Sequence, residues 1–247
     1  MMEIYSEIEG IREFLKENKL QKKSIGFVAT IGALHEGHLE LIRKSVAQND
    51  LTVCSIFVNP TQFNNPNDLK NYPREVASDL EKIKKLNCSA AFIPPANKMY
   101  EENFIMNFDF GYMEKIMEGT FRPGHFKGVG LIVTKLFNII LPDRAYFGKK
   151  DLQQLTLIKT MTKELLFDVD IIPVDTVREK DGLAMSSRNK LLSASERSHA
   201  TDIYKALTTA KKKLNSGESV LSVKEYTQNF FSKTSKIKLE YFEVVNT

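Results

Sequence analysis

The chain of 247 residues contains only two cysteines, Cys54 and Cys88, and they do not form a CxxC pair. This excludes a disulfide framework and a cysteine zinc site, and it fits a reducing cytoplasm, where we expect the protein to be located. Long apolar runs are also missing, because the longest, GVGLIVTKLFNIIL, is interrupted by Lys135 and Asn138. The acidic N-terminus has no apolar segment of the secretory kind. We therefore expect neither membrane insertion nor secretion.

A strong charge of one sign is absent as well. Lys and Arg number 35 and Asp and Glu 31, which leaves a net charge of +4, and the lysines are spread along the chain. Binding of nucleic acid would need basic residues clustered on one element, so we expect no nucleic-acid partner. The small positive excess is a weak indication of anionic small molecules. The basic run at 211–213 lies in a polar helical stretch and is interpreted as a solvated face.

Short, continuously apolar segments alternate with amphipathic segments up to about residue 177. The predicted strands are 24–30, 51–58, 90–95, 144–148 and 169–174, and the predicted helices are 37–49, 74–87, 129–140 and 151–166. This alternation is typical of a parallel sheet with helices on both faces. We predict an α/β, Rossmann-like domain over residues 1–177.

The pattern changes after residue 177. A polar loop rich in Ser, Gly and Arg covers 178–196, and helices are predicted at 195–215 and 222–232. A final strand is predicted at 237–245. We therefore expect a small C-terminal α+β domain over 178–247, and because a lone strand needs a partner, we expect this domain to be shortened.

Four polar loops follow predicted strands, at 30–38, 59–69, 147–154 and 177–189. The carboxyl ends of parallel strands meet at one edge of a sheet, where ligands of doubly wound folds bind. We expect the four loops to form one ligand site.

The loop TIGALHEGH brings two of the four histidines, His35 and His38, to the start of a predicted helix. A metal site is one interpretation, although the spacing differs from HExxH and no third ligand is near in the sequence. Another interpretation is that the imidazole rings have a structural role, with hydrogen bonds to backbone carbonyls. The phosphate interpretation is favoured, because Gly32 and Gly37 allow close approach and a helix N-terminus attracts anions. Imidazoles there can donate to phosphoryl oxygens.

The other loops offer groups that suit a nucleotide and a small acid. Lysines beside a glycine in 148–151 could hold a triphosphate, although such lysines are usually solvent-exposed. The segment 185–189 supplies two hydroxyls and a guanidinium. Gln62 and Gln154 could orient a small hydroxy acid, whereas His125 in RPGHF is ambiguous by itself.

The segments TIGALHEGHLELI, SIFVNPTQF, YPRE, EGTFRPGHFKGV, FGKKDLQQL and VREKDGLAMSSRN, in this order, resemble the pantoate–β-alanine ligase (pantothenate synthetase) family over about residues 25–192. The resemblance implies a Rossmann-like domain related to class I aminoacyl-tRNA synthetases, a small C-terminal capping domain and a homodimer. It implies that ATP activates (R)-pantoate as pantoyl adenylate, releasing pyrophosphate. The amine of β-alanine then gives pantothenate and AMP, with Mg²⁺ on the phosphates.

The resemblance also implies residue roles. Catalytic roles fall to His38, as proton donor, and to His35, Lys150, Ser186 and Arg188. ATP binding falls to Ile31, Gly32, Ala33, Leu34, His35, Glu36, Gly37, His38, Gly148, Lys149, Lys150, Asp151, Val177, Met185, Ser186, Ser187 and Arg188. Binding of pantoate and β-alanine falls to Asn59, Gln62, His125 and Gln154, and Asp79 is the candidate magnesium ligand.

The chain departs from the family pattern in a few positions. Ala29 and Ile31 stand where the family usually has Pro and Met, which changes backbone freedom and side-chain stiffness. Both replacements are apolar, so we expect activity with a modified pocket shape. Ser78 precedes Asp79 where the family often has two acidic residues, which weakens the magnesium assignment. The alternatives are another adenylyl-transferring nucleotidyltransferase and a non-catalytic nucleotide-binding protein on the same scaffold.

Overall fold

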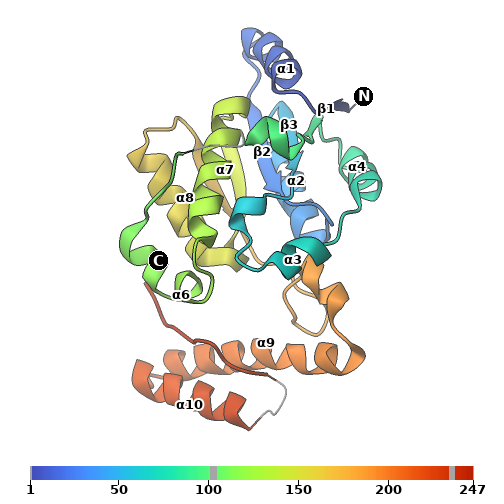
Figure 1. Cartoon of the computed structure of the whole chain (residues 1–247). Coiled ribbons are helices and arrows are strands. Elements are labelled where there is room, and N and C mark those ends of the chain that lie inside the picture. Colours follow the sequence, from blue (N-terminus) through green and yellow to red (C-terminus); the bar gives the residue numbers. More distant parts are fainter. Residues whose placement is uncertain (1, 101–104, 234–236, 247) are drawn as a thin grey trace. The chain divides into compact units, whose positions relative to one another are not determined.

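A computed structural model describes residues 2–100, 105–233 and 237–246 of the chain (Figure 1). The chain divides into two compact units, Met1–Thr176 and Val177–Thr247. The division falls one residue before the boundary expected from the sequence. None of the helices in the described residues is both long and apolar enough to cross a bilayer.

A parallel sheet forms the centre of the first unit, and its six described strands have the order β1-β4-β3-β2-β5-β6. The strands are β1 (Glu3–Tyr5), β2 (Ile25–Thr30), β3 (Leu51–Ile56), β4 (Ala90–Phe92), β5 (Arg144–Gly148) and β6 (Asp170–Val174). Phe27 of β2 and Val53 of β3 belong to one core cluster, whereas the next residues, Val28 and Cys54, belong to another. Alternate side chains are thus buried on opposite faces, which explains why these strands are continuously apolar.

Helices cover both faces of the sheet (Figure 1). On one face lie α2 (Glu36–Gln48) and α4 (Val76–Lys85), which contact each other. On the other face α7 (His125–Ile140) contacts both α1 (Ile8–Leu20) and α8 (Leu152–Glu164). Shorter elements join them: η1 (Pro60–Gln62), α3 (Pro66–Asn71), α5 (Ala96–Met99), η2 (Gly111–Lys115), α6 (Glu118–Phe121) and η3 (Lys149–Asp151).

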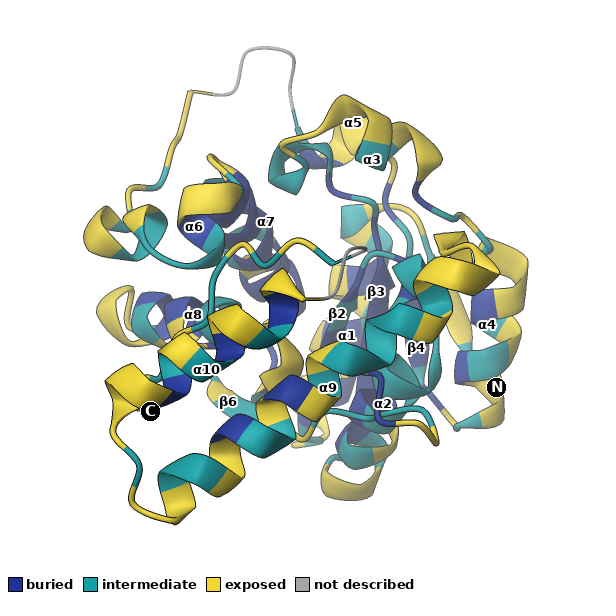
Figure 2. Cartoon of the chain, turned by 90° about the horizontal axis from the view of Figure 1, so that it is seen from below, coloured by how far each residue is buried: buried dark blue, intermediate teal, exposed yellow. Residues whose placement is uncertain are grey.

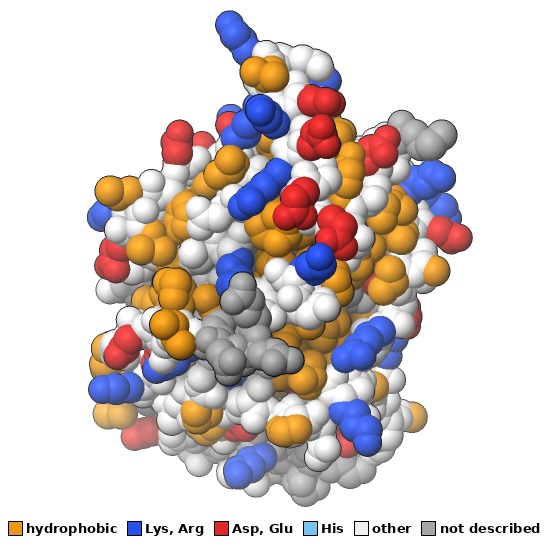
Figure 3. All heavy atoms as spheres, turned by 45° about the horizontal axis from the view of Figure 1, so that its top comes forward, with side chains coloured by type: hydrophobic (Ala, Val, Ile, Leu, Met, Phe, Trp, Pro, Cys, Tyr) orange, Lys and Arg blue, Asp and Glu red, His pale blue; other side chains and the backbone are white. Residues whose placement is uncertain are grey.

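The strands and helices predicted for the first unit are all present, with ends that differ by a few residues. The largest shift is at α7, which begins at His125 rather than at 129, because Gly124 at φ +79° turns the chain just before it. Both β1 and α1 were missed by the sequence prediction. The three residues of β1 are too few to show a period, although Ile11 and Leu15 of α1 have helical spacing and are buried. Around α1, acidic and basic side chains are interspersed on the surface (Figure 3).

Two helices form most of the second unit, α9 (Ala194–Asn215) and α10 (Val220–Ser232), preceded by η4 (Ser187–Leu191). The two helices contact each other, and Figure 2 shows buried positions on both in dark blue. The buried residues are Ala206 and Ala210 of α9 and Val223, Thr227 and Phe231 of α10.

The α+β prediction for the second unit is wrong over the described residues. Residues 237–246 form no strand, and the only extended pairing described within 177–233 and 237–246 is an isolated bridge between Arg178 and Ala184. The final segment is instead tied to α10, since Lys224 Nζ lies 2.7 Å from a carboxylate oxygen of Glu243. Among the described residues, no strand pairs with 237–245, and without a partner a segment of β-rich composition forms no ladder.

Candidate active site

The loops after β2 and β5 flank the point where the winding of the sheet changes direction. From β2 the chain proceeds through β3 to β4 on one side, and it then crosses to β5 and β6 on the other side of β2. In doubly wound folds ligands bind beyond the carboxyl ends of strands at such a switch point. The turn 30–38 and the turn 148–151 are therefore placed where the sequence prediction put them.

The turn after β2, which we call the histidine turn (residues 31–38), uses two left-handed residues, Gly32 at φ +85° and Ala33 at φ +50°. Glycine adopts this conformation freely, whereas alanine at such an angle is strained and needs support from its surroundings. Within the turn, His35 is the N-cap of α2, and its Nδ1 accepts a hydrogen bond from the N–H of Gly37 at 3.1 Å. In return, Nδ1 of His38 accepts from the N–H of His35 at 3.4 Å. The two rings lie 4.1 Å apart, centre to centre.

These hydrogen bonds define the tautomers of both rings. Because each Nδ1 accepts, each neutral imidazole carries its proton on Nε2 and can donate from that atom. Burial, followed by the electrostatic influence of His35, Lys150 and Lys82, lowers the pKa of His38 to about 3. His38 is therefore neutral near pH 7, with one N–H available to an anion.

Among the three interpretations of the histidine pair, the metal site receives no support. Within the described ranges no three His, Cys, Asp or Glu side chains come together as a metal site. The structural role is real, since His35 caps α2. The phosphate interpretation changes in detail: the N–H of Gly37 is already bonded to His35, so the imidazole Nε2–H groups, more than that backbone group, are the donors offered to an anion.

The lysines after β5 diverge. Lys149 Nζ lies 2.7 Å from Oδ1 of Asp175, the residue that follows β6. Lys150 lies 3.5 Å from Asp151 and is one of the charges that lower the pKa of His38. Of the two lysines expected to hold a triphosphate, Lys150 therefore remains the candidate. Gly148 ends β5 and lets the chain enter η3.

Asp79 does not fit the magnesium role expected for it. Its carboxylate is fully buried, and Oδ1 accepts from the N–H of Leu34 at 2.8 Å and from Lys82 Nζ at 3.3 Å. An ammonium at this distance would repel a divalent cation. The sequence prediction missed Lys82, although an acid and a base three residues apart on a predicted helix is a recognisable pair.

A pocket of about 90 Å³ lies beside the histidine turn. Its polar lining consists of Thr30, Asn59, Gln62 and Gln154, and its apolar lining of Ala29, Ile31, Phe57, Val129, Ile132, Val133, Leu136 and Phe147. The structure thus brings together three of the four residues expected to bind pantoate and β-alanine. Ala29 and Ile31, the positions that depart from the family pattern, are part of the wall, and Ile31 also begins the histidine turn.

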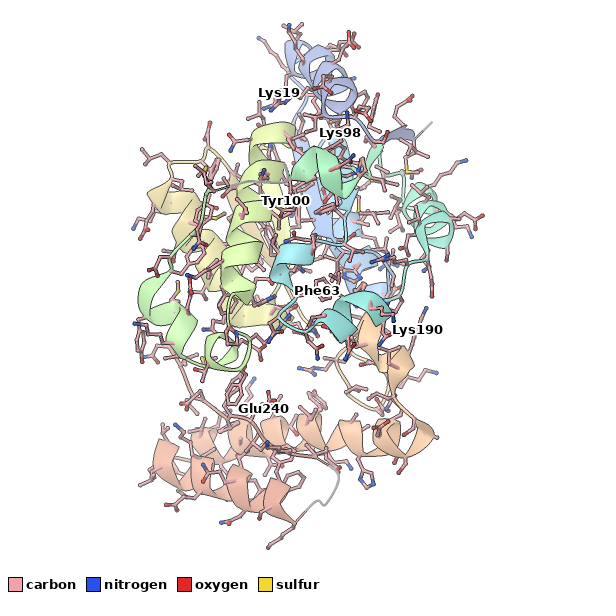
Figure 4. The ribbon with its side chains drawn as sticks, in the orientation of Figure 1. Lys19, Phe63, Lys98, Tyr100, Lys190 and Glu240 are labelled. Atoms are coloured by element: carbon pink, nitrogen blue, oxygen red, sulfur yellow. The ribbon has the colours of Figure 1, made fainter. Side chains whose placement is uncertain are left out.

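Hydrogen bonds orient the amide groups in this pocket. Asn59 Nδ2 donates to Gly128 O at 3.1 Å and to Gln62 Oε1 at 3.2 Å, and its Oδ1 accepts from the hydroxyl of Tyr100 at 2.6 Å (Figure 4 labels Tyr100). Because a backbone carbonyl only accepts, Asn59 Nδ2 must face it, and the oxygen of Gln62 must face Asn59. This leaves Nε2 of Gln62 for a ligand oxygen. Tyr100 was missed by the sequence prediction.

His125, which was expected in the pocket wall, is not among the residues that line this pocket, and it contacts the backbone of Gln62 instead. Its Nδ1 is 2.8 Å from Gln62 O and its Nε2 is 3.1 Å from Arg122 NH1. Since the carbonyl only accepts and the guanidinium only donates, the ring is neutral with its proton on Nδ1. Burial and Arg122 lower the pKa of His125, in agreement with this assignment. His125 therefore anchors the turn that carries Gln62.

Close packing holds the same turn from the α7 side. A Cβ atom on Gly128 would lie 2.2 Å from Thr61 O and 2.5 Å from the backbone nitrogen of Gln62. Only glycine allows this approach of helix and turn. The sequence prediction gave no role to Gly128.

The Ser/Arg segment belongs to the second unit. It follows a narrow loop in which the N–H of Met185 donates to Val177 O and that of Glu179 donates to Leu183 O. Ser186 caps η4, accepting from the N–H of Arg188 at 3.3 Å, and Ser187 is buried. Two of the predicted phosphate-binding residues are thus part of the local fold of this segment. Within the histidine turn, the carboxylate of Glu36 pairs with Arg43 along α2.

Comparison with known proteins agrees with this geometry. The sequence model described as pantoate-beta-alanine ligase matches residues 3–247. The chain is similar to the pantothenate synthetase of Caldicellulosiruptor bescii, at 47% identity over 99% of this chain and 87% of that protein. It is also similar to that of Thermodesulfovibrio yellowstonii, at 49% over 92% and 81%.

Two solved structures are similar as well. The pantothenate synthetase of Thermus thermophilus matches with a TM-score of 0.93 and 36% identity, covering 99% of this chain and 87% of that one. The pantoate-beta-alanine ligase of Francisella tularensis, complexed with beta-gamma ATP and beta-alanine, matches with a TM-score of 0.87 and 34% identity, covering 100% and 90%.

Proposed function

Because the chain belongs to the pantoate–β-alanine ligase family, we propose that it condenses (R)-pantoate with β-alanine at the expense of ATP, through a pantoyl adenylate. The observation that carries this proposal is the continuity of the two sites. Thr30 and Ile31 line the amide-bearing pocket and lead directly into the turn that ends in His35 and His38. An acid held in the pocket is therefore next to the donors that suit a phosphate.

The pocket suits pantoate, which has a carboxylate, hydroxyl groups and two methyl groups on one carbon. The amides of Gln62 and Gln154 can bind the oxygens, and the wall formed by α7 and Phe57 can hold the methyl groups. With Gln62 Nε2 directed away from Asn59, the pocket offers a donor to an oxygen of the acid. We assign β-alanine to the same pocket after adenylate formation, near Gln62 and Asn59.

In the first step, a pantoate carboxylate oxygen attacks the α-phosphorus of ATP, and the bond from that phosphorus to the bridging oxygen of pyrophosphate breaks. Negative charge then increases on the leaving pyrophosphate. The Nε2–H groups of His35 and His38 and the ammonium of Lys150 are the groups of the first unit that can stabilise this charge. Such a step depends on positioning more than on covalent catalysis.

In the second step, the amine of β-alanine attacks the acyl carbon of the adenylate, the bond from that carbon to the AMP oxygen breaks, and the amine loses a proton. We assign the ribose and phosphates to Gly148, Lys150 and Asp151, and adenine to the neighbourhood of Val177. We assign further phosphate contacts to Ser186, Ser187 and Arg188, following the family resemblance. Mg²⁺ would enter bound to the phosphates of ATP, and no protein ligand is assigned to it.

Two further assignments follow the family resemblance. We propose that the protein works as a homodimer, which light scattering after gel filtration would test. We also place it in the cytoplasm, in agreement with two buried cysteines that are free thiols.

A coupled assay for AMP tests the function. We expect AMP to form only when pantoate, β-alanine and ATP are all present, and pyrophosphate to be released when β-alanine alone is omitted. Pyrophosphate release without any acid would contradict the proposal. A thermal-shift screen of pantoate against nucleotide monophosphates would reveal a different nucleotidyltransferase, and ATP binding without turnover would indicate a non-catalytic protein.

A further inference from the structure

We propose that Asp79 and Lys82 of α4 are positioning residues that hold the histidine turn in place through the backbone of Leu34, and that adenylate formation depends on them. The proposal rests on the function proposed above. It assigns no contact with the substrate to either side chain.

Both polar groups of the Leu34 backbone are bound by this pair. The Leu34 N–H donates to Asp79 Oδ1 at 2.8 Å, and Lys82 Nζ donates to Leu34 O at 2.9 Å. Lys82 Nζ also lies 3.3 Å from the same Oδ1, which joins the two side chains. Leu34 is the residue before His35, so a fixed Leu34 determines where α2 and its two histidines begin.

The turn needs such support from outside. Gly32 and Ala33 both have positive φ, a conformation that a free chain with alanine at this position rarely adopts. The preceding residue, Thr30, is held by the sheet, because its Oγ1 donates to Ser55 O at 2.7 Å. Between this anchor and the N-cap at His35, the contacts from α4 bind both backbone polar groups of Leu34.

The burial of Asp79 argues for a specific role rather than general stability. The carboxylate is inaccessible to solvent, and its Oδ2 has no hydrogen-bond partner in the described part of the protein. A Cβ atom on Gly32 would lie 3.5 Å from Oδ2, so the carboxylate lies directly under the turn. An apolar residue could fill such a site at lower cost, and buried ion pairs are often retained for the geometry they impose.

Lys82 also affects the histidines electrostatically. Together with Lys150, its charge disfavours protonation of His38. The side chain is partly exposed, and Glu75 lies 4.0 Å from its ammonium. The same side chain therefore holds Leu34 and favours the neutral His38 that donates from Nε2.

Pantoate-dependent exchange of pyrophosphate into ATP tests the proposal in four variants: Lys82→Met, Lys82→Arg, Asp79→Asn and the double variant Asp79→Asn/Lys82→Met. Lys85→Met, an exposed lysine of the same helix, is the matched control. We expect Lys82→Met to lower kcat about 30- to 100-fold, since small displacements of catalytic groups have effects of this size, while the KM for pantoate changes less than about twofold. Lys82→Arg, which can still donate to Leu34 O, should recover most of the loss.

The double variant distinguishes positioning from direct binding of ATP. If the two residues act as one unit through Leu34, the double variant is no slower than Lys82→Met. If Lys82 binds a phosphate directly, the two effects multiply and the KM for ATP rises, which would overturn the proposal. A wild-type kcat in Lys82→Met would overturn it too.

A second measurement does not depend on turnover. In ring spectra of histidine-labelled protein, Lys82→Met should shift the His35 and His38 signals and leave that of His199 unchanged, with a melting temperature within a few degrees of the control. Unchanged His35 and His38 signals would overturn the proposal. If Lys82→Met does not fold, the same spectra recorded on Asp79→Asn test the proposal instead. Failure of wild type and Lys85→Met to carry out the exchange would contradict the proposed function, and the spectra would still test the positioning.

Discussion

The two units hold their candidate phosphate-binding segments in different ways. In the first unit the histidine turn follows β2, a strand of a sheet with an apolar core cluster on each face. Leu34 of the turn belongs to one of these clusters, and side chains of α4 bind its backbone. In the second unit few side chains are buried, and the segment before η4 is held by polar groups. Arg197 contacts Glu179 at 2.6 Å and Asp181 at 2.7 Å, and Asn189 donates to Glu179 and to Ala184 O.

This difference indicates how the work is divided. Under the proposed function, the groups that must keep a fixed geometry around the reacting phosphorus lie in the unit with the larger core, where local opening is costly. The Ser/Arg segment of the second unit is held by few apolar contacts and by exposed polar pairs, so it is expected to open locally more often. We therefore expect substitutions in the first unit to change the rate or the fold, and substitutions in the second unit to change local opening.

The strongest test of the first unit is His38→Ala. Losing the Nε2–H donor should lower the rate of adenylate formation about 100- to 1,000-fold, because one preorganised donor to a developing charge has an effect of this size. Pantoate-dependent pyrophosphate exchange measures the rate, and circular dichroism shows whether the fold is kept. His199→Ala, on α9 of the second unit, is the matched control. Near-normal exchange in His38→Ala would remove this residue from the mechanism.

The next largest effect is expected for Gly128→Ala. The new methyl group would lie 2.2 Å from Thr61 O, so α7 or the Gln62 turn must move. We expect a loss of about 1–3 kcal/mol in the free energy of unfolding and a higher KM for pantoate, measured by urea denaturation and by the AMP assay. Asn138→Ala, exposed on the same helix, is the control. A Gly128→Ala variant with normal stability and KM would show that the approach of α7 and the turn is not needed.

We next predict that His38 makes the stability of the first unit depend on pH. Its pKa is about 3 in the folded protein and about 6.5 in an unfolded chain, so the unfolded state takes up the proton first. The contribution of the neutral His38 ring to the free energy of unfolding is therefore fully present above pH 6.5, and it is lost as the pH falls toward 3. Relative to His38→Gln, the wild type should lose stability over this window in urea denaturation. A wild-type ring signal that titrates near pH 6.5 would contradict the prediction.

The smallest effect is expected in the second unit. Arg197→Met removes the cation that joins Glu179 and Asp181, and amide hydrogens of residues 177–189 should exchange faster. Exchange in β2 and β5 should stay unchanged, as should the melting temperature of the first unit. Lys205→Met removes an exposed pair with Asp202 and serves as control. Faster exchange that extends into β2 would show that the two units are not independent in this respect.

Much of the site could be predicted from the sequence because it depends on local patterns. Apolar segments of strand length showed where β2 and β5 end, and the winding of a parallel sheet brings those ends together. The pairing of His35 with His38 follows from their spacing at a helix start. The amides Gln62 and Gln154 could be placed at the same edge for the same reason.

Other parts could not be predicted, because they depend on contacts between residues far apart in the chain. The backbone of Leu34 is bound by side chains of α4, and the direction of the Lys149 side chain depends on Asp175. The tautomer of His125 depends on Gln62 O, and the final strand predicted for 237–245 fails because no strand lies beside it.

The amino-acid sequence by itself thus determined the alternation of strands and helices from β2 to β6, the loops proposed to carry the chemistry and the family, since periodicity and motif spacing are local properties of the chain. Only the tertiary structure decided which nitrogen of each imidazole donates, which lysine faces the histidines, and that Asp79 supports a turn instead of binding a metal. Each of these depends on a hydrogen-bond partner or a neighbouring charge that folding brings from another element, and such partners leave no pattern in the sequence.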